Sequence, residues 1–214
     1  MVDVPVFTDD FQRADSVTLG PPWGFAGTVG ASLRVVSGEA VALTPYPGPG
    51  YFSLSSGNPS PAFSFGLLPD NGLSNYSVRV TSALPDPILE PVALYSNQDN
   101  YITVADVYGG PAIIVVVGGV IVSVGDTLLS PVDDRSLVVQ GNEVWCVNSD
   151  DFGFTSTSAP VSIPSGLPRT GIAGMSWLPY YSGTTQTHNH VTLFEVLTPG
   201  MFGAFQDGRT LFDR

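Results

Sequence analysis

The strongest constraint on the fold is a series of short, β-prone runs joined by two-residue turns. Residues 112–117 and 120–124 consist almost entirely of Val, Ile and Ala, and they flank Gly118-Gly119. Two glycines readily adopt the positive φ angles of a type I′ turn, so this segment is predicted to form a β-hairpin. Two further hairpins are predicted in the same way, around Ser37-Gly38 (residues 32–43) and around Gly141-Asn142 (residues 136–148).

The other predicted strands also lie between turn-forming residues. Residues 76–81 alternate apolar and polar side chains with a period of two, which is typical of a strand with one solvent-exposed face. Residues 97–100, Asn-Gln-Asp-Asn, are strong turn formers and separate two apolar runs. The remaining strands are predicted at residues 91–96, 101–107, 171–177 and 190–197.

Composition argues against an extensively helical fold. The 214 residues include 24 glycines, 19 prolines and no lysine, so the straight-chain residues that cover helix surfaces are scarce. No repeat of 20–50 residues stands out, which disfavours a propeller or a solenoid. We therefore predict one all-β domain over residues 1–197, an antiparallel β-sandwich of the jelly-roll type with little or no helix.

The two ends of the chain differ from the predicted domain. Residues 198–214 carry Pro199-Gly200 and aromatic residues in a turn-rich context, and we expect them to be an arm that docks on this domain or on a neighbour. The first residues lack the basic and apolar regions of a signal peptide. We therefore expect synthesis in the cytoplasm without export by a cleaved signal.

The hairpin at residues 112–124 has a consequence for assembly. It is uncharged and contains no proline, so an exposed edge there would promote aggregation. We expect it to be buried on both faces or covered by a partner. This expectation favours a homo-oligomer or a larger assembly.

The formal net charge of −12 restricts the partners. Seven arginines against nineteen acidic residues do not supply the basic face that nucleic-acid binding requires. No apolar run reaches the length of a membrane span. The single cysteine, Cys146, lies in an apolar run and is predicted to be buried and inert, because reactive thiols need exposure and a lowered pKa.

No pattern for catalysis is present, so we predict that the chain is not an enzyme. Glycoside hydrolysis needs two carboxyl groups facing one cleft, but Glu39, Glu143 and Glu195 are isolated in the sequence. The chain also lacks a G-x-S-x-G nucleophile elbow and a glycine-rich phosphate loop. We predict no cofactor.

Two groups of residues have some capacity for metal binding. His188 and His190 would point to the same side of an extended segment, but no third ligand lies nearby. Asp133-Asp134 and Asp150-Asp151 offer oxygen ligands without the spacing of a calcium loop. We interpret all of them as polar loop residues and predict no metal site.

Aromatic residues in and beside loops are the remaining candidates for contacts. Sugars stack on such rings, and protein interfaces use them as anchors. Tyr180 and Tyr181 lie in a loop after Pro179, and together with Trp177 they are our candidate residues for ligand or partner contact. Core packing is the alternative for Trp177 and for Phe52, which lies with Tyr46 and Tyr51 in a second loop region.

The opening of the chain resembles a known family. Residues 9–23 fit the pattern D-x-F-x-R-x-[ND], followed by Leu19-Gly20 and Trp23. This pattern resembles the start of concanavalin-A-like (laminin-G-like) jelly rolls in minor tail and other virion proteins of phages that infect actinobacteria such as mycobacteria, and in some bacterial surface proteins. Similar segments follow in the same order at residues 76–80, 137–144, 169–174 and 191–196, whereas residues 45–75 do not align.

The residues of the opening also have a direct interpretation. Phe11, Leu19 and Trp23 can anchor an N-terminal strand on the sheet, and Arg13 can tie the turn to Asp10 and Asp15. The resemblance implies a virion structural protein, most simply a minor tail component that contacts other tail proteins and adheres to glycans of the host envelope. The alternatives are a carbohydrate-binding module and, less favoured by the carboxylates, a glycan hydrolase of the same fold.

Overall fold

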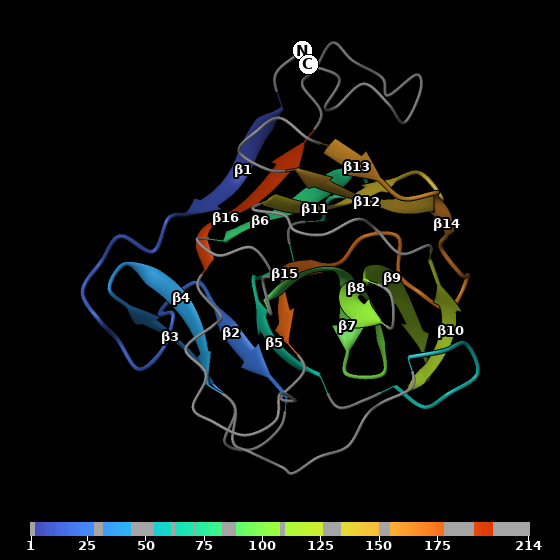
Figure 1. Cartoon of the computed structure of the whole chain (residues 1–214), viewed down its shortest axis with the longest axis horizontal. Helices are drawn as coiled ribbons and strands as arrows, with labels where there is room; N and C mark the ends of the chain where they lie inside the picture. The colour runs from blue at the N-terminus through green and yellow to red at the C-terminus, as the bar shows by residue number, and fades with distance from the viewer. Residues whose placement is uncertain are drawn as a thin grey trace.

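The computed structural model describes residues 3–27, 32–43, 54–60, 63–70, 72–82, 89–107, 110–125, 134–149, 155–177 and 191–198. These residues contain sixteen β-strands in two antiparallel sheets and no helix (Figure 1). None of them forms a helix that could cross a membrane. The prediction of an all-β sandwich is confirmed.

The first sheet, sheet A, has nine strands, most of which lie across the top of Figure 1. Its strands pair in the order β13-β12-β11-β6-β16-β4-β3, with β1 added to β16 and β14 added to β12. Their bounds are β1 (Val4–Asp9), β3 (Ser32–Val36), β4 (Glu39–Leu43), β6 (Tyr76–Ser82), β11 (Asp134–Gln140), β12 (Glu143–Ser149), β13 (Thr155–Thr157), β14 (Val161–Ser162) and β16 (Val191–Thr198).

The second sheet, sheet B, has seven strands and lies below most of the strands of sheet A in Figure 1. They pair in the order β10-β9-β8-β7-β15-β5-β2. Their bounds are β2 (Gly24–Ala26), β5 (Ser64–Leu67), β7 (Glu90–Asn97), β8 (Asn100–Val107), β9 (Gly110–Val117), β10 (Val120–Val124) and β15 (Ile172–Trp177).

The three predicted hairpins are confirmed with their turns. β3 and β4 join at Ser37-Gly38, β9 and β10 at Gly118-Gly119, and β11 and β12 at Gly141-Asn142. Gly118 and Gly119 have φ angles of 60° and 76°, the values that a type I′ turn requires. The predicted strands at residues 76–81, 91–96, 101–107, 171–177 and 190–197 are also present, each within two residues of its expected bounds.

The main hydrophobic core lies between the two sheets. Alternate residues of the facing strands fill it, such as Val78 and Val80 from β6 in sheet A and Ile102 and Val104 from β8 in sheet B. Cys146 belongs to the same core, and burial raises the pKa of its thiol to about 12. The prediction of a buried cysteine is therefore confirmed.

The hairpin of β9 and β10 is protected by its own chain. In β9, Ile113 and Val115 point into the main core, while Ile114 and Val116 are equally buried on the other face. The outer edge of β10 is paired with residues 57–60, because Gly57 N donates to Ile121 O (2.7 Å) and Ile121 N donates to Asn58 O (2.9 Å). The expectation of burial on both faces is therefore met for β9 but not for β10, where Val120 and Val122 are 38% and 41% exposed.

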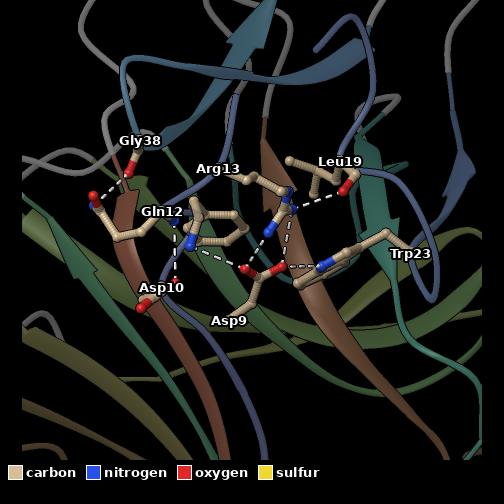
Figure 2. A network of polar contacts seen from close by, with 8 residues as sticks. Asp9, Asp10, Gln12, Arg13, Leu19, Trp23 and Gly38 are labelled. Atoms are coloured by element: carbon tan, nitrogen blue, oxygen red, sulfur yellow. Dashed lines mark hydrogen bonds and ion pairs between the residues drawn. The ribbon is translucent and has the colours of Figure 1, made fainter. Parts of the chain in front are cut away.

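The opening segment, residues 9–23, fastens β1 to the sandwich (Figure 2). Phe11 and Leu19 are buried in the core, and the Trp23 ring packs against Phe194 at 4.8 Å between ring centroids. The proposed partners of Arg13 need correction. Arg13 forms its ion pair with Asp9 (2.6 Å), because both guanidinium nitrogens can reach that carboxylate four residues earlier.

Asp10 and Asp15 have other partners in the opening segment. The Asp10 carboxylate accepts the backbone N–H of Gln12 (3.1 Å), and Asp15 accepts the backbone N–H of Ser37 (2.7 Å). Both carboxylates therefore hold backbone groups, and the second ties the opening segment to the β3–β4 turn.

The predicted arm at residues 198–214 lies outside the described residues except for Thr198. Thr198 is the last residue of β16, where it pairs with Val4 of β1. The strand thus extends one residue past the predicted end of the domain.

Candidate functional site

The predicted contact residues have different positions in the structure. Trp177 ends β15 with a completely buried side chain that packs in the main core, which is the alternative role given for it above. Tyr180 and Tyr181 lie outside the described residues, as do Tyr46, Tyr51 and Phe52. Tyr180 and Tyr181 therefore remain the candidates for an exposed aromatic contact, and the described residues do not test them.

The acidic residues weighed for catalysis all lie in sheet A, on three different strands. Glu39 is on β4, Glu143 is exposed on β12, and Glu195 on β16 forms an ion pair with Arg79.

Of the residues weighed for metal binding, only Asp134 is described. Its carboxylate accepts a hydrogen bond from the Thr81 hydroxyl. The others lie outside the described residues: Asp133, Asp150, Asp151, His188 and His190. Among the described residues, no three His, Cys, Asp or Glu side chains gather as metal ligands.

A second hydrophobic cluster lies on the face of sheet B that points away from sheet A. In β8, Ile102 and Val104 face the main core, whereas Tyr101 and Ala105 belong to this second cluster. Such alternation follows from the two-residue period of a strand. The second cluster thus occupies the outer face of sheet B.

Four aromatic rings form the centre of this outer face. Phe65 lies 4.9 Å from both Tyr95 and Tyr101, measured between ring centroids. Phe63 lies 5.8 Å from Tyr101 in an edge-to-face arrangement. All four side chains are less than 8% exposed, so they form a rigid aromatic floor.

Three turns meet at one end of this floor, and we call residues 55–60, 96–100 and 118–119 the turn cluster. Backbone hydrogen bonds join them: Ser60 N donates to Gly119 O (2.8 Å), and Gly119 N donates to Asp99 O (2.9 Å). The Asn100 side-chain oxygen also accepts from Gly118 N (3.0 Å). These cross-links fix the three turns relative to one another.

The turn cluster joins the aromatic floor through a pair of hydroxyl groups. The Ser60 hydroxyl lies 2.6 Å from the Tyr101 hydroxyl. Burial raises the pKa of Tyr101, and the negative charge of Asp99 raises it further. Burial and then the Asp99 charge raise the pKa of Tyr95 as well. Asp99 therefore acts electrostatically on both tyrosines of the floor.

Several side chains of the turn cluster face solvent. Asn97 and Asp99 are exposed, and no described residue donates a hydrogen bond to the Asp99 carboxylate. The Asn97 oxygen accepts from Asp99 N and from the Asn100 amide, both at 2.9 Å, which orients the Asn97 side chain. The cluster thus presents oriented amide and carboxylate groups above an aromatic base.

This arrangement suits the chemistry of sugar recognition. Sugar hydroxyls both donate and accept hydrogen bonds, so they pair with fixed amide, hydroxyl and carboxylate groups. Pre-organised groups also bind at a lower entropic cost than mobile ones. The buried rings of the floor support the turns from below, and the exposed side chains of the turns supply the polar groups.

The sequence pattern assigns no role to any of these residues and predicts no strand or turn for residues 55–65. Residues 97–100 are a predicted turn, and Tyr101 lies in a predicted strand. The available signal was the alternation in β8, which places Tyr101 and Ala105 on one face. No local pattern connects that face to residues 55–60, because the contact between Ser60 and Tyr101 spans 41 positions.

Comparisons with known proteins identify the fold. The sequence matches no protein-family model and no curated protein. Among solved structures, it is similar to GH43B of the Bacteroides ovatus xyloglucan PUL, with a TM-score of 0.52 and 15% identity. That match covers 93% of this chain and 40% of that protein, so this chain spans less than half of its length.

The second similarity is to the exoplasmic/lumenal domain of VIP36. Its Ca²⁺-bound form gives a TM-score of 0.50 at 11% identity, covering 90% of this chain and 89% of that one. Its Ca²⁺/Man3GlcNAc-bound form also gives 0.50, at 10% identity, covering 92% and 89%. At this identity the likeness shows the fold alone.

The calcium of the VIP36 structures raises the question of whether the turn cluster fits such an ion. Ca²⁺ takes six to eight oxygen ligands, usually with several carboxylates. The cluster offers one carboxylate, Asp99, and the side-chain oxygens of Asn97 and Asn100 already accept hydrogen bonds. The described residues of the cluster do not fit Ca²⁺. What the chain shares with VIP36 is the concanavalin-A-like β-sandwich.

Proposed function

We propose that this chain is a carbohydrate-binding module whose glycan contacts lie at the turn cluster of sheet B. The observation that carries the proposal is the combination of cross-linked turns, exposed polar side chains at Asn97 and Asp99, and the aromatic floor of Tyr95 and Tyr101. The fold is similar to that of VIP36, and one of the VIP36 structures is a Ca²⁺/Man3GlcNAc-bound form. This similarity supports a carbohydrate-binding function.

The proposed mode of binding uses the exposed groups for specificity. The Asn97 amide and the Asp99 carboxylate hydrogen-bond sugar hydroxyls, while the floor keeps the turns in place. Tyr95, which is 7% exposed, is the ring of the floor most open to solvent. The proposed function is adhesion without chemical turnover.

The experiment is a glycan array with the purified full chain, followed by calorimetric titration of the strongest ligand. Asn97→Ala and Asp99→Ala are expected to weaken binding at least about tenfold together, because each removes a hydrogen-bonding side chain of the site. The matched control is Asn142→Ala, which changes an exposed turn residue in the β11–β12 hairpin of sheet A.

The outcomes separate cleanly. Loss of binding in the sheet B variants with retention in Asn142→Ala supports the proposal. Absence of binding to every glycan by the intact chain contradicts it. Loss of binding in Asn142→Ala alone would move the site to sheet A.

A second candidate function is a structural role in a phage virion, as a minor tail component without enzymatic activity. The resemblance of the opening segment favours it, and in the structure the motif residues Asp9, Arg13 and Trp23 form one network (Figure 2). Mass spectrometry of purified particles tests this role, and absence of the chain from virions would contradict it.

A further inference from the structure

The residues of the turn cluster and of its floor include no basic residue. The seven strands of sheet B and the three turns contain no Arg, Lys or His. Of the described arginines, Arg13, Arg79 and Arg135 each form an ion pair with a carboxylate. Arg34 is on β3 of sheet A, and Arg169 donates to the backbone oxygen of Ile163.

The charges near the turn cluster are negative. The Asp99 carboxylate is exposed and acts on both tyrosines of the floor. The protein as a whole has a formal net charge of −12. An anion that approaches this face therefore meets repulsion from Asp99, and neither the turns nor the strands of sheet B supply a cation to bind it.

Recognition of anionic groups depends on cations. Arginine binds carboxylate, sulfate or phosphate groups through paired, charge-assisted hydrogen bonds, and lysine binds them as a point charge. Uncharged hydroxyl groups need no such partner and pair with amide and carboxylate oxygens. An amino sugar, with a protonated amine, would gain from the Asp99 charge.

From these charges, and resting on the proposed function, we infer that the site selects uncharged or amino-bearing glycans and rejects glycans that carry carboxylate, sulfate or phosphate groups. Asp99 is the specificity-determining residue in this inference. It attracts an amine, accepts hydrogen bonds from hydroxyls and repels anionic substituents.

The test compares glycans that differ in charge. The full chain is titrated with neutral mannan and glucan oligomers, with chitosan oligomers and with polygalacturonate and sulfated oligomers of similar length. Neutral or amino-bearing oligomers are expected to bind about fivefold or more tightly than the anionic ones, the effect of one unit charge at roughly 4 Å in water. The difference should shrink in about 1 M NaCl, where the Debye length falls to about 3 Å.

Asp99→Asn provides the matched variant, because it keeps the shape of the side chain and removes its charge. The preference for neutral over anionic oligomers should fall severalfold, and any advantage of chitosan should disappear. An anionic glycan that binds more tightly than its neutral counterpart overturns the inference while the proposed function stands. Binding to none of these glycans overturns the proposed function, and the inference with it.

Discussion

The opening segment and the turn cluster are both short, polar and tied by hydrogen bonds, yet they use their polar groups differently. In the opening segment the Asp9 carboxylate accepts hydrogen bonds from Phe11 N, from Arg13 and from the Trp23 indole N–H (2.8 Å). In the turn cluster the corresponding carboxylate, Asp99, accepts none from a described residue.

The difference follows from which atoms make the cross-links. The Arg13 guanidinium donates hydrogen bonds to Asp9 and to the backbone oxygen of Leu19 (2.7 Å), so side chains hold the opening segment together. In the turn cluster, backbone groups make most of the hydrogen bonds that join the turns, such as the one between Ser60 N and Gly119 O. Side chains that the fold does not need remain available for a ligand.

Trp23→Ala is expected to have the largest effect on stability. The ring packs against Phe7 at 5.9 Å and Phe194 at 4.8 Å, and its N–H is bonded to Asp9. Removing a large aromatic side chain from such packing costs about 3–5 kcal/mol. Urea unfolding followed by circular dichroism measures the loss, and binding by the folded fraction should be unchanged.

The control for this variant is Val17→Ala in the same segment. Val17 is 82% exposed, so the free energy of unfolding should change by less than about 0.5 kcal/mol. A loss below about 1 kcal/mol in Trp23→Ala would show that the opening segment does not fasten the sandwich.

Asp9→Asn tests the electrostatic part of the opening segment. Burial alone would raise the pKa of Asp9, but the hydrogen bonds from Arg13, Trp23 and Phe11 N outweigh it and hold the pKa below the ordinary value of 3.8. Because its pKa is lowered in the folded state, Asp9 stabilises the protein at pH values above 3.8. That contribution is lost as the pH falls below 3.8 through the lowered pKa.

The expected cost of Asp9→Asn is about 1–3 kcal/mol at neutral pH, and the variant should lose part of the decline in stability on acidification. Unfolding curves at a series of acidic pH values measure both effects. Asp10→Asn is the matched control, since the Asp10 carboxylate is exposed and bonds only the backbone N–H of Gln12 among the described residues. Equal behaviour of the two variants would contradict the role of the Asp9 network.

The sequence predicted the strands well because local signals determine them. The turn pairs Ser37-Gly38, Gly118-Gly119 and Gly141-Asn142 need positive φ angles, and five of the six residues have them. Strands β2, β5, β13 and β14 escaped prediction because each has only two to four residues, and β5 also includes Gly66. A Cβ at Gly66 would lie 2.3 Å from the end of the Leu33 side chain, which would then have to move.

The sites were less predictable because they depend on contacts across the sequence. The residues of the opening indicated that Arg13 ties the turn, but the predicted partners, Asp10 and Asp15, were wrong, because the ion pair is with Asp9. The aromatic floor brings Phe63 and Phe65 of one segment to Tyr95 and Tyr101 of another. Sheet pairing through β15 creates that proximity, and no local motif encodes it.

Tyr101→Phe probes the link between the floor and the turn cluster. The change removes the hydroxyl that lies against Ser60 while keeping the ring, so the cost should be about 1 kcal/mol. Because the pKa of Tyr101 is raised in the folded protein, its protonated form stabilises the fold below pH 10.0, and this contribution is lost as the pH rises further. Unfolding at neutral and alkaline pH should show both effects, and an unchanged stability profile in Tyr101→Phe would contradict them.

Asp99→Asn should have the smallest effect on stability. It therefore tests most directly whether the turn cluster differs from the opening segment. No described residue donates a hydrogen bond to this carboxylate, so the free energy of unfolding should change by less than about 0.5 kcal/mol, against the larger loss in Asp9→Asn. The pKa of Tyr95 should fall toward its ordinary value, because the Asp99 charge is one cause of its increase. Titration of Tyr95 by NMR measures this shift. If Asp99→Asn destabilised the fold as strongly as Asp9→Asn, the turn cluster would be a second structural fastening, because its carboxylate would be needed by the fold itself.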